Sequence, residues 1–459
     1  MRSKRFRKGR LVFIFDNAYF ERIMRGSLPA LTFALAGMLA GCSSSTITRS
    51  ATAPGQAEPD AARPSTNSGA SGESTTQRLR DDEGAPLSPS PRPATVTIAS
   101  TGDLLLTREV IDVWHGMGRE GLDRMLSGYA SLIHDDEIAT LNLETPLVDD
   151  VNQTLPGSPP LPPVLGAPPD AVFALQRAGV DLVSLANNHV FDQGFAGLQR
   201  TLELLENTGI EHAGVGPSRE DSFRSTVVRQ GGARVAFLSM TGLVNGRSER
   251  RGDRRLYVAV LFDEARVLEA IRAARLDADL VVVCVHWSTD FVPEPTEGQR
   301  LLARRMVEAG ADLILGTGPH VLQEVERLPS ARGEAVVAYS LGNLLSAMAM
   351  RYQSGQPVNM RSEPSRVRPE GRDGVVLRVR LEVATPSPGR PAAAPDQTLH
   401  IAALEAIPLW THNTSLDHEN HGTPLEIRVV PLNQAPAEIE AERRPRIAEA
   451  LGDAVELLR

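Results

Sequence analysis

Carboxylates and amides that end apolar runs are the first candidates for chemistry in this chain. Asp103 closes the alternating run Thr95–Thr101, and the segment Leu141–Pro146 carries Asn142 and Glu144 two residues apart. Side chains two apart on a strand share a face, so Asn142 and Glu144 should act together. A lone Gly-Asp pair more often marks a turn than a ligand, so the meaning of Asp103 depends on the other segments.

A dense polar cluster follows the buried run Leu182–Ala186. Asn187, Asn188, His189 and Asp192 all fall within one short loop. Asparagine turns are common in protein structures, but an Asn-Asn-His cluster directly after a core strand is hard to explain by packing. We therefore interpret this loop as functional.

Two further histidines, His286 and His320, follow apolar runs that begin with Asp-Leu. Each alone could be a satisfied structural histidine. Three histidines at three strand ends, together with Asp, Glu and Asn, form a suitable site for one or two hard or borderline metal ions. Another strand-end loop, Tyr339–Asn343, adds Asn343.

The elements that must position these residues are predicted from hydrophobic periodicity. Strands and helices alternate in the first part, and sites in such α/β sheets lie at the carboxyl ends of the strands. The predicted strands are Thr95–Thr101, Glu137–Leu143, Leu182–Ala186, Leu280–Val285, Asp312–Leu315 and Glu334–Tyr339, with a hairpin over Val227–Met240 that turns at Gly231-Gly232. The predicted helices are Asp170–Ala178, Gly197–Asn207, Ala265–Arg275 and Gly298–Ala309.

Strands dominate the later part. Val375–Val383, His400–Pro408 and Leu425–Val430 read as antiparallel strands, residues 351–373 as a polar loop rich in Arg, and residues 436–459 as a terminal amphipathic helix. We predict one α/β domain over 95–350 whose sheet is completed by strands from 374–459.

The N-terminus has the features of a lipoprotein signal peptide. Arg25 gives a positive region, Leu28–Ala40 gives an apolar region, and Leu39-Ala-Gly-Cys42 fits a lipobox whose Cys42 receives lipid. The alternative is an ordinary cleavage site with a chance cysteine. We further hypothesise that translation begins at Met24, because residues 1–23 differ in composition from the rest.

Residues 42–94 are rich in Ser, Thr, Pro, Ala and Gly without apolar periodicity, which predicts a flexible tether. The chain after residue 41 holds 40 basic and 55 acidic residues, a balance that argues against nucleic acid as a partner. Cys284 lies in an apolar run and should be buried and inert. We expect a membrane-anchored protein of the cell envelope that faces the periplasm or the exterior.

These polar segments, in this order, resemble the CapA family of bacterial capsule or poly-γ-glutamate synthesis proteins. The resemblance covers roughly residues 95–345. It is carried by Gly102-Asp103, Asn142-Leu-Glu144, Ala186-Asn-Asn-His189 with Asp192 and Gly194, His286-Trp287, Pro319-His320 with Gln323 and Glu326, and Tyr339-Ser-Leu-Gly-Asn343.

The resemblance implies a calcineurin-like metallophosphoesterase type of layered sandwich, with central β-sheets flanked by helices. It further implies a divalent metal site. Its metal ligands would be Asp103, Glu144, Asn188, His286 and His320. His189 would be the acid/base or the phosphate contact, with Asp192 to orient it. Asn142, Asn187, Trp287, Gln323 and Asn343 would line the cleft.

The sequence departs from the family pattern at two potential ligands. Gly318 stands where the family usually has a histidine, and Leu105 stands where phosphoesterases of this fold have another. The sequence is therefore compatible with a binuclear site, with a single metal ion or with no metal.

Two functions remain open. The first is metal-dependent hydrolysis or transfer on phosphate or amide bonds of envelope polymers. The second is a non-catalytic partner in capsule or poly-γ-glutamate synthesis and export, whose cleft binds an anionic polymer with the help of Arg351, Arg361, Arg366 and Arg368. A solvated loop is the competing explanation of these arginines.

Overall fold

The computed structural model describes residues 93–151, 164–245, 256–352, 368–383 and 398–459. The predicted signal peptide, Cys42 and the tether lie outside these residues. Among the residues that are described, no helix is both long and apolar enough to cross a bilayer.

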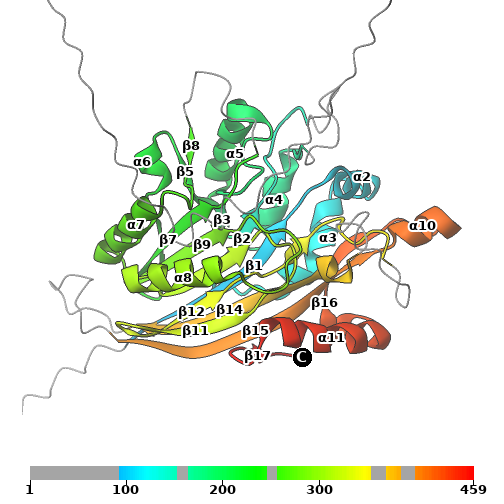
Figure 1. The fold of residues 1–459 in the computed structure, drawn as a ribbon. Coiled ribbons are helices and arrows are strands. Elements are labelled where there is room, and N and C mark those ends of the chain that lie inside the picture. Colours follow the sequence, from blue (N-terminus) through cyan, green and yellow to red (C-terminus); the bar gives the residue numbers. More distant parts are fainter. Residues whose placement is uncertain (1–92, 152–163, 246–255, 353–367, 384–397) are drawn as a thin grey trace, which may run out of the picture. The chain divides into compact units, whose positions relative to one another are not determined.

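One large sheet organises the described chain (Figure 1). Its first half runs in the order β4-β3-β2-β1-β14, and its second half continues as β15-β12-β10-β9-β7-β6. The first half consists of β4 Glu211–Ala213, β3 Leu182–Ser184, β2 Ile138–Leu143, β1 Ala94–Leu104 and β14 Asp373–Val383. The second half consists of β15 Leu399–Asn413, β12 Gly333–Ala338, β10 Leu313–Thr317, β9 Leu280–His286, β7 Ala233–Thr241 and β6 Thr226–Gln230.

Shorter strands extend this sheet or stand beside it. β11 Val325–Ser330 pairs with β12, β13 Asn343–Leu345 pairs with β1, and β16 Ile427–Pro431 and β17 Glu456–Leu457 both pair with β15. β5 Val215–Gly216 and β8 Tyr257–Val258 form a separate pair.

The two halves of the sheet face each other across a shared inner core. Alternate residues of each strand point to opposite sides of the sheet, so each strand contributes to two cores. Ile98 and Ile138 share an inner core with Phe237 and Val282 of the opposite half. Their neighbours, such as Ala99, belong to a second core under the helices.

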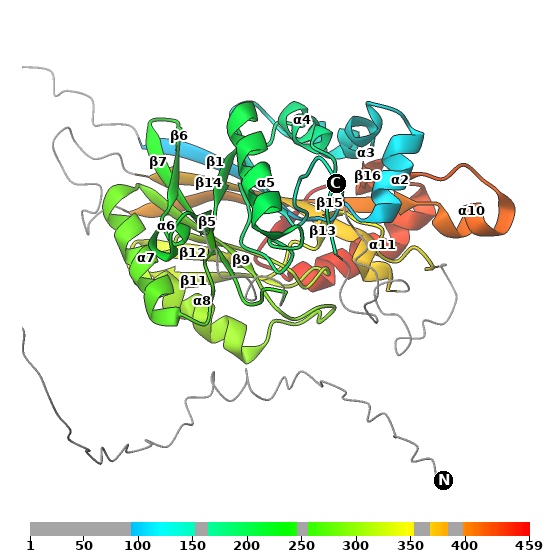
Figure 2. The same ribbon diagram turned by 90° about the horizontal axis from the view of Figure 1, so that it is seen from above.

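Helices cover both outer faces. The first group consists of α2 Arg108–Gly116, α3 Gly121–Ala130, α4 Asp170–Arg177 and α5 Gly194–Thr208. The second consists of α7 Glu264–Asp277, which packs on β7 and β9, and α8 Glu297–Ala309, and it lies apart from the first in both views (Figures 1 and 2). The remaining helices are α6 Arg219–Ser222, η1 Pro369–Arg372, α10 Ser415–His421, η2 Leu432–Gln434 and α11 Ala437–Leu451. The predicted layered α/β sandwich is thereby confirmed.

The late strands complete the sheet, as predicted. β14 pairs antiparallel with β1 on one side and with β15 on the other, and β15 meets β12 at Gly333 and Leu399. The two halves are therefore joined through strands that come last in the chain.

The predicted hairpin is also confirmed. β6 and β7 pair antiparallel with Gln230 opposite Ala233, so the turn is the two residues Gly231 and Gly232. Both have positive φ, at 58° and 85°, which is the conformation that two-residue hairpins require and that glycine adopts without strain.

Several predictions about elements were wrong or incomplete. The terminal helix ends at Leu451 rather than 459, because Gly452 follows with positive φ and β17 then joins the sheet beside β15. Helices α2, α3 and α10 and strand β11 were not predicted. Of the predicted loop 351–373, residues 353–367 lie outside the described part, and β14 already begins at Asp373.

Candidate metal centre

The Glu144 carboxylate lies at the centre of the polar cluster that the strand ends bring together. The residue follows β2 and is fully buried. Its Oε1 atom lies 3.7 Å from His286 Nε2, 3.8 Å from His320 Nε2 and 4.0 Å from His189 Nε2. No described residue donates a hydrogen bond to this oxygen. Three imidazoles thus surround one buried, unpartnered acceptor.

Asp103 forms hydrogen bonds with residues from both halves of the sheet at this cluster. It lies in β1, and its Oδ2 atom accepts the Gly318 backbone N–H at 3.1 Å and lies 3.0 Å from His320 Nδ1. Its Oδ1 accepts a hydrogen bond from Asn142 Nδ2 at 2.8 Å. Asp103 therefore fixes the ring of His320 so that Nε2 faces Glu144.

The Asn142 amide connects the cluster to β3. Its Nδ2 atom also lies 3.4 Å from Glu144 Oε2 and 3.3 Å from His286 Nδ1. Its Oδ1 accepts hydrogen bonds from Ser184 Oγ and Asn187 Nδ2, both at 3.2 Å. The pairing of β1, β2 and β3 sets this arrangement, since Asn142 stands opposite Asp103 and Ser184 in the register.

The loop after β3 gives its two asparagines different environments. Asn187 is satisfied: its Nδ2 donates to the Leu143 carbonyl at 2.9 Å, and its Oδ1 accepts the His189 N–H at 3.1 Å. Asn188 Oδ1 is buried without a partner among the described residues. Asn187 thus shapes the loop, and Asn188 keeps the free oxygen that a ligand needs.

The structure brings His189 and Asp192 together. His189 Nδ1 lies 2.6 Å from Asp192 Oδ2, and the same oxygen accepts the Leu165 N–H at 2.7 Å. A carboxylate at Nδ1 holds the proton on that nitrogen and leaves Nε2 as the atom that faces Glu144.

Burial dominates the electrostatics of the cluster. Burial and the negative charge of Asp103 raise the pKa of Glu144 well above its usual range. Burial lowers the pKa of His286 to about 3, so this imidazole is neutral at neutral pH.

Asp103 and His320 behave as a charged pair. Burial alone would raise the pKa of Asp103, but the hydrogen bond and positive charge of His320 bring it below its usual value. Burial opposes the charge of His320, but Glu144 and Asp103 raise its pKa to about 10.

Backbone strain is concentrated where His320 is held. His320 and Phe291 have φ of 58° and 57°, which is rare for residues with a side chain. The Phe291 N–H donates to the Pro319 carbonyl at 2.8 Å, and the Phe291 and His320 rings lie 6.0 Å apart. Such strain persists only when the surroundings enforce it, and it clusters at functional sites.

The other predicted cleft residues serve the framework. Trp287 is buried, and its indole N–H donates to the Tyr339 carbonyl at 3.0 Å. Asn343 Nδ2 donates to the carbonyl of His320 at 3.1 Å and so supports the strained segment. Gln323 is fully buried and donates to the Val292 carbonyl at 2.7 Å. None of the three forms a hydrogen bond with the Glu144 carboxylate.

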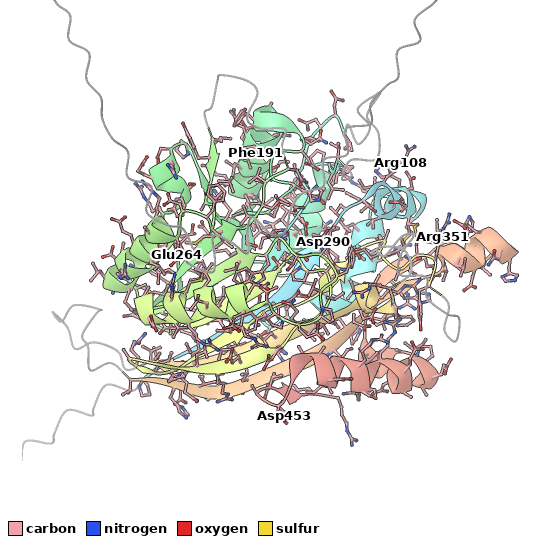
Figure 3. All side chains as sticks on the ribbon, viewed as in Figure 1. Arg108, Phe191, Glu264, Asp290, Arg351 and Asp453 are labelled. Carbon is pink, nitrogen blue, oxygen red and sulfur yellow. The ribbon has the colours of Figure 1, made fainter. Side chains whose placement is uncertain are left out.

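Three polar residues at the centre were not predicted as site residues. Thr317 Oγ1 lies 3.4 Å from His286 Nδ1, and Asn245 Nδ2 lies 3.4 Å from His189 Nδ1. Asp290 is exposed, and its charge acts on both Glu144 and His320 (Figure 3). Asp290 follows His286 by four residues in the same strand-end loop, so its position was a usable signal, whereas Asn245 has no such context.

The donor set fits a divalent cation. The gaps of 3.7 to 4.0 Å around Glu144 Oε1 exceed hydrogen-bond length. An ion at about 2.0–2.2 Å from a carboxylate oxygen and from an imidazole nitrogen fills such a gap. Asp103, Glu144 and His286 also each offer one ligand atom within 4.8 Å of the others. An ion would satisfy the unpartnered oxygen that the fold leaves in the interior.

The two positions that lack a potential imidazole differ in their surroundings, and only Gly318 has no room for a side chain. Leu105 is buried, and it donates its backbone N–H to Leu345. Gly318 has φ of 99°, and a Cβ there would lie 2.4 Å from the Trp287 carbonyl oxygen. Neither position can offer an imidazole, so the described residues supply one compact set of ligands.

Fold and cluster together define an α/β protein with a buried carboxylate–imidazole centre at the carboxyl ends of its parallel strands. The chain belongs to the family described as bacterial capsule synthesis protein PGA_cap, whose model matches residues 97–348. The predicted resemblance to the CapA family is thereby confirmed.

Curated relatives agree with this family. The capsule biosynthesis protein CapA of Bacillus anthracis is 29% identical over 255 residues, which are 54% of this chain and 59% of the relative. The PGA biosynthesis protein CapA of Bacillus subtilis is 31% identical over 178 residues, 38% of this chain and 45% of the relative. A probable polyglutamine synthesis accessory protein of Mycobacterium tuberculosis is 28% identical over 169 residues, 34% of this chain and 44% of the relative. The chain thus spans about half the length of these relatives.

Solved structures show only distant likeness. A hypothetical protein from Thermus thermophilus is 19% identical with a TM-score of 0.32, over 67% of this chain and 98% of that one. The sulfate thiohydrolase SoxB of the same organism is 18% identical with a TM-score of 0.29, over 61% of this chain and 38% of that one. Scores this low define no activity for the present chain.

Proposed function

We propose that this protein is an envelope lipoprotein of the CapA family that hydrolyses or transfers phosphate or amide bonds of a capsule-type polymer with one divalent metal. The observation that carries the proposal is the buried Glu144 Oε1, unpartnered and 3.7 to 4.0 Å from three imidazole nitrogens. A purely structural carboxylate would be hydrogen-bonded at such a position.

Glu144, His286 and His320 would hold the metal, with Asn188 and Asp103 as further oxygen ligands, and His320 would give up its Nε2 proton on binding because a coordinating imidazole is neutral. When bound, the ion would lower the pKa of a water molecule and stabilise charge that develops on oxygen. His286 is already neutral, so its Nε2 lone pair is free to coordinate. Asp103 would keep the His320 ring in place through Nδ1.

His189 would move the proton. Its Nε2 is the farthest of the three from Glu144 Oε1, at 4.0 Å, and Asp192 holds its Nδ1 at 2.6 Å. The ring can therefore donate from, or accept at, a single fixed atom. This supports a role in protonating a leaving group or contacting a bound phosphate.

The polymer is assigned from the relatives, whose names refer to capsule, PGA and polyglutamine synthesis. Asp290 is exposed beside the centre, and its negative charge would oppose a polyanion unless a bound metal offset it. A lipid on Cys42 would place the domain near the membrane where such a polymer emerges.

Metal analysis combined with matched variants tests the proposal. The purified wild type should carry about one divalent ion and hydrolyse a phosphodiester or amide model substrate. His286→Ala should lose the ion and the activity, whereas His189→Ala should keep the ion and lose the activity. His115→Ala, an exposed histidine on α2, should change neither.

The alternative is a non-catalytic partner that binds the polymer. It is favoured by the absence of two potential imidazole ligands: Gly318 stands where the family usually has a histidine, and Leu105 stands where phosphoesterases of this fold have another. A wild-type protein that holds no metal and still supports surface polymer in cells would establish this alternative and end the first proposal.

A further inference from the structure

Three residues with a side chain have positive φ among the described residues, and one short segment holds all three. They are Phe291, His320 and Ala349, with φ of 57°, 58° and 54°. Residues with a Cβ rarely take this conformation, because it brings the Cβ too close to the backbone. Such a backbone persists only where its surroundings enforce it. The donors that hold these residues therefore mark the part of the molecule that enforces the strain.

Residues 368–372, which are Arg368 and helix η1, supply two of these donors directly. Arg368 Nη1 donates a hydrogen bond to the Phe291 carbonyl. Arg372 is buried, and its Nη2 donates to the Ala349 carbonyl at 2.6 Å. A guanidinium group carries its N–H donors on a rigid plane, so it holds the carbonyl that it bonds in a defined orientation.

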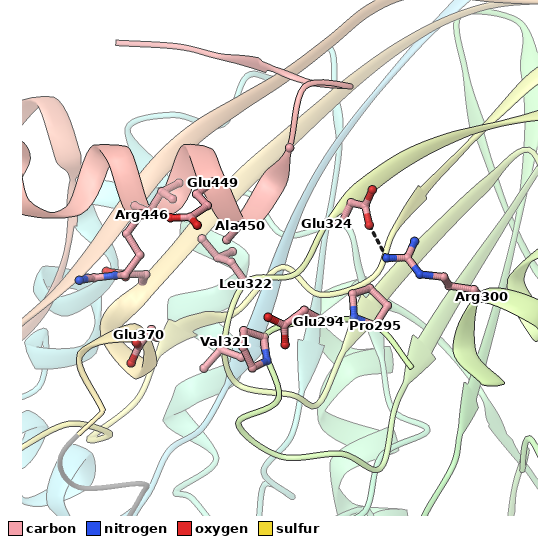
Figure 4. Close-up of a pocket in the computed structure, with 14 residues that line it drawn as sticks. Glu294, Pro295, Arg300, Val321, Leu322, Glu324, Glu370, Arg446, Glu449 and Ala450 are labelled. Atoms are coloured by element: carbon pink, nitrogen blue, oxygen red, sulfur yellow. Dashed lines mark hydrogen bonds and ion pairs between the residues drawn. The ribbon is translucent and has the colours of Figure 1, made fainter. Parts of the chain in front are cut away.

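The same segment holds His320 through an intermediate side chain. The Nδ2 atom of Asn343 donates to the Gly371 carbonyl at 3.0 Å and to the His320 carbonyl at 3.1 Å. Glu370 and Val321, the residue after His320, line one cavity, so the segment lies beside the strained turn (Figure 4). All three strained carbonyls are therefore bonded to this segment or to a side chain that it holds.

At Phe291 both flanking peptide groups are fixed. Its N–H donates to the Pro319 carbonyl at 2.8 Å, and its carbonyl accepts from Arg368. Two fixed peptide planes define φ and ψ of the residue between them, so the strained conformation cannot relax unless one bond breaks. The Pro319 peptide group leads directly into His320, whose ring lies 6.0 Å from the ring of Phe291. Arg368 thereby acts on the segment that carries the His320 imidazole.

This segment lies outside the part of the chain that the family model matches, which ends at residue 348. It is anchored at its far end, because the next residue, Asp373, pairs with Arg443 and Arg446 of helix α11. The C-terminal part of the chain therefore reaches the strained turns as well as completing the sheet.

We propose that residues 368–372 form a clamp for the metal centre, with Arg368 as a positioning residue that fixes the strained turn at Phe291 and the segment that carries His320. The purpose of the clamp rests on the proposed metal site, but the clamp itself can be tested without metal.

Hydrogen-exchange mass spectrometry of the full-length chain in EDTA tests the clamp. Arg368→Ala should speed exchange in the peptides that contain Phe291 and Gly318 by roughly tenfold or more, because local opening there loses its restraint. Peptides from β2 and β7 should keep their protection. Arg368→Lys keeps one charged donor and should retain part of the protection, and Arg272→Ala, an exposed arginine on α7, should change nothing. Unchanged exchange in Arg368→Ala, or equal acceleration across β2 and β7, would overturn the proposal.

Calorimetric titration with Zn²⁺ links the clamp to the centre. Arg368→Ala should weaken Zn²⁺ binding roughly tenfold, because a ligand that is no longer held in place must be ordered on binding. Glycine takes positive φ without strain, so in a Phe291→Gly background the same change should weaken binding by less than about threefold. Equal weakening in both backgrounds would overturn the role of Arg368 through Phe291. A wild type that binds no divalent ion would end the proposed metal function, and the exchange result would then decide on the clamp by itself.

Discussion

At the scale of single residues, the centre depends on side chains whose surroundings alter their ordinary chemistry. Glu144 is the clearest case, because it combines complete burial, a nearby Asp103 and an oxygen without a donor. A bound cation would offset the negative charge of Asp103 and give the unpartnered oxygen a partner.

The Glu144→Gln variant should lose metal and yet be more stable than the metal-free wild type. Folding raises the pKa of Glu144, so the carboxyl group contributes fully to the stability of the folded state below the pKa that it has in the unfolded chain. This contribution is lost as the pH rises toward the pKa of the folded state, because the buried group must then ionise. In EDTA at pH 7.5 we expect the variant to melt higher, by about 2 °C or more. The difference should shrink toward pH 4 in thermal unfolding curves, and an unchanged or lower melting temperature at pH 7.5 would contradict it.

Gly318→Ala should destabilise the fold and displace His320. Its φ of 99° and the 2.4 Å approach to the Trp287 carbonyl combine strain with a clash. We expect a loss of about 2–3 kcal/mol in urea unfolding, with loss of metal. Gly118→Ala is the matched control, because its φ is 84° and nothing lies within 4 Å of the added Cβ. It should cost about 1 kcal/mol and leave the metal in place.

Cys284 should not react in the folded protein. Burial raises the pKa of its thiol to about 12, so almost no thiolate exists at pH 8. Peptide mapping after iodoacetamide treatment should find Cys284 unmodified in native protein and fully modified in guanidinium. Substantial labelling of the native protein would show that β9 opens readily.

At the scale of elements, helix α11 is attached to the sheet by an ion pair of Arg443, a residue in the middle of the helix. Arg443 is almost fully buried, pairs with Asp373 of β14 and lies over the Trp410 ring of β15, 5.5 Å from its centroid. Arg446, one turn on, bonds the other oxygen of Asp373 at 2.7 Å. Helix α11 is therefore fastened to the two strands that join the sheet halves.

Arg443→Met should reduce stability by about 3–5 kcal/mol, because it leaves a buried carboxylate with one partner fewer. Chemical denaturation measures this directly. Arg304→Met, on the exposed face of α8 with a single ion pair at 3.9 Å, should change stability by less than about 1 kcal/mol. The double variant Arg443→Met with Asp373→Asn should recover part of the loss, and no recovery would show that Arg443 acts mainly through its packing on Trp410.

The parts of the fold that could be predicted are those that a local pattern determines. The core strands show unbroken apolar runs, and polar residues directly after them mark the site, so Asp103, Glu144 and the three histidines were found. Helices α2 and α3 were missed although their buried residues recur at helical spacing, as Leu122, Met125 and Leu126 of α3 do. β17 was missed because two residues pair only through tertiary contact with β15. Asn245 reaches His189 from a distant loop, which no local pattern reveals.

At the scale of the whole molecule, the matched family segment is not a complete folding unit. The family model ends at residue 348, but β14 and β15 lie between β1 and β12 in the sheet. A fragment of residues 93–350 would expose both edges and part of the inner core. We expect it to aggregate or to be protease-sensitive, whereas residues 93–459 should unfold cooperatively by circular dichroism. A stable, metal-binding short fragment would refute this expectation.

The position of β14 and β15 also bears on when the site is assembled during synthesis and folding. Asp103, Glu144 and His189 belong to one half of the sheet, and His286 and His320 to the other, so the ligands converge only when the two halves come together. Strands β14 and β15 pair between the halves and hold them in this arrangement. A ribosome delivers those strands last. If the centre binds a cation as proposed, the complete ligand set would form only late in folding, and the cation would be taken up in the compartment in which the final strands dock.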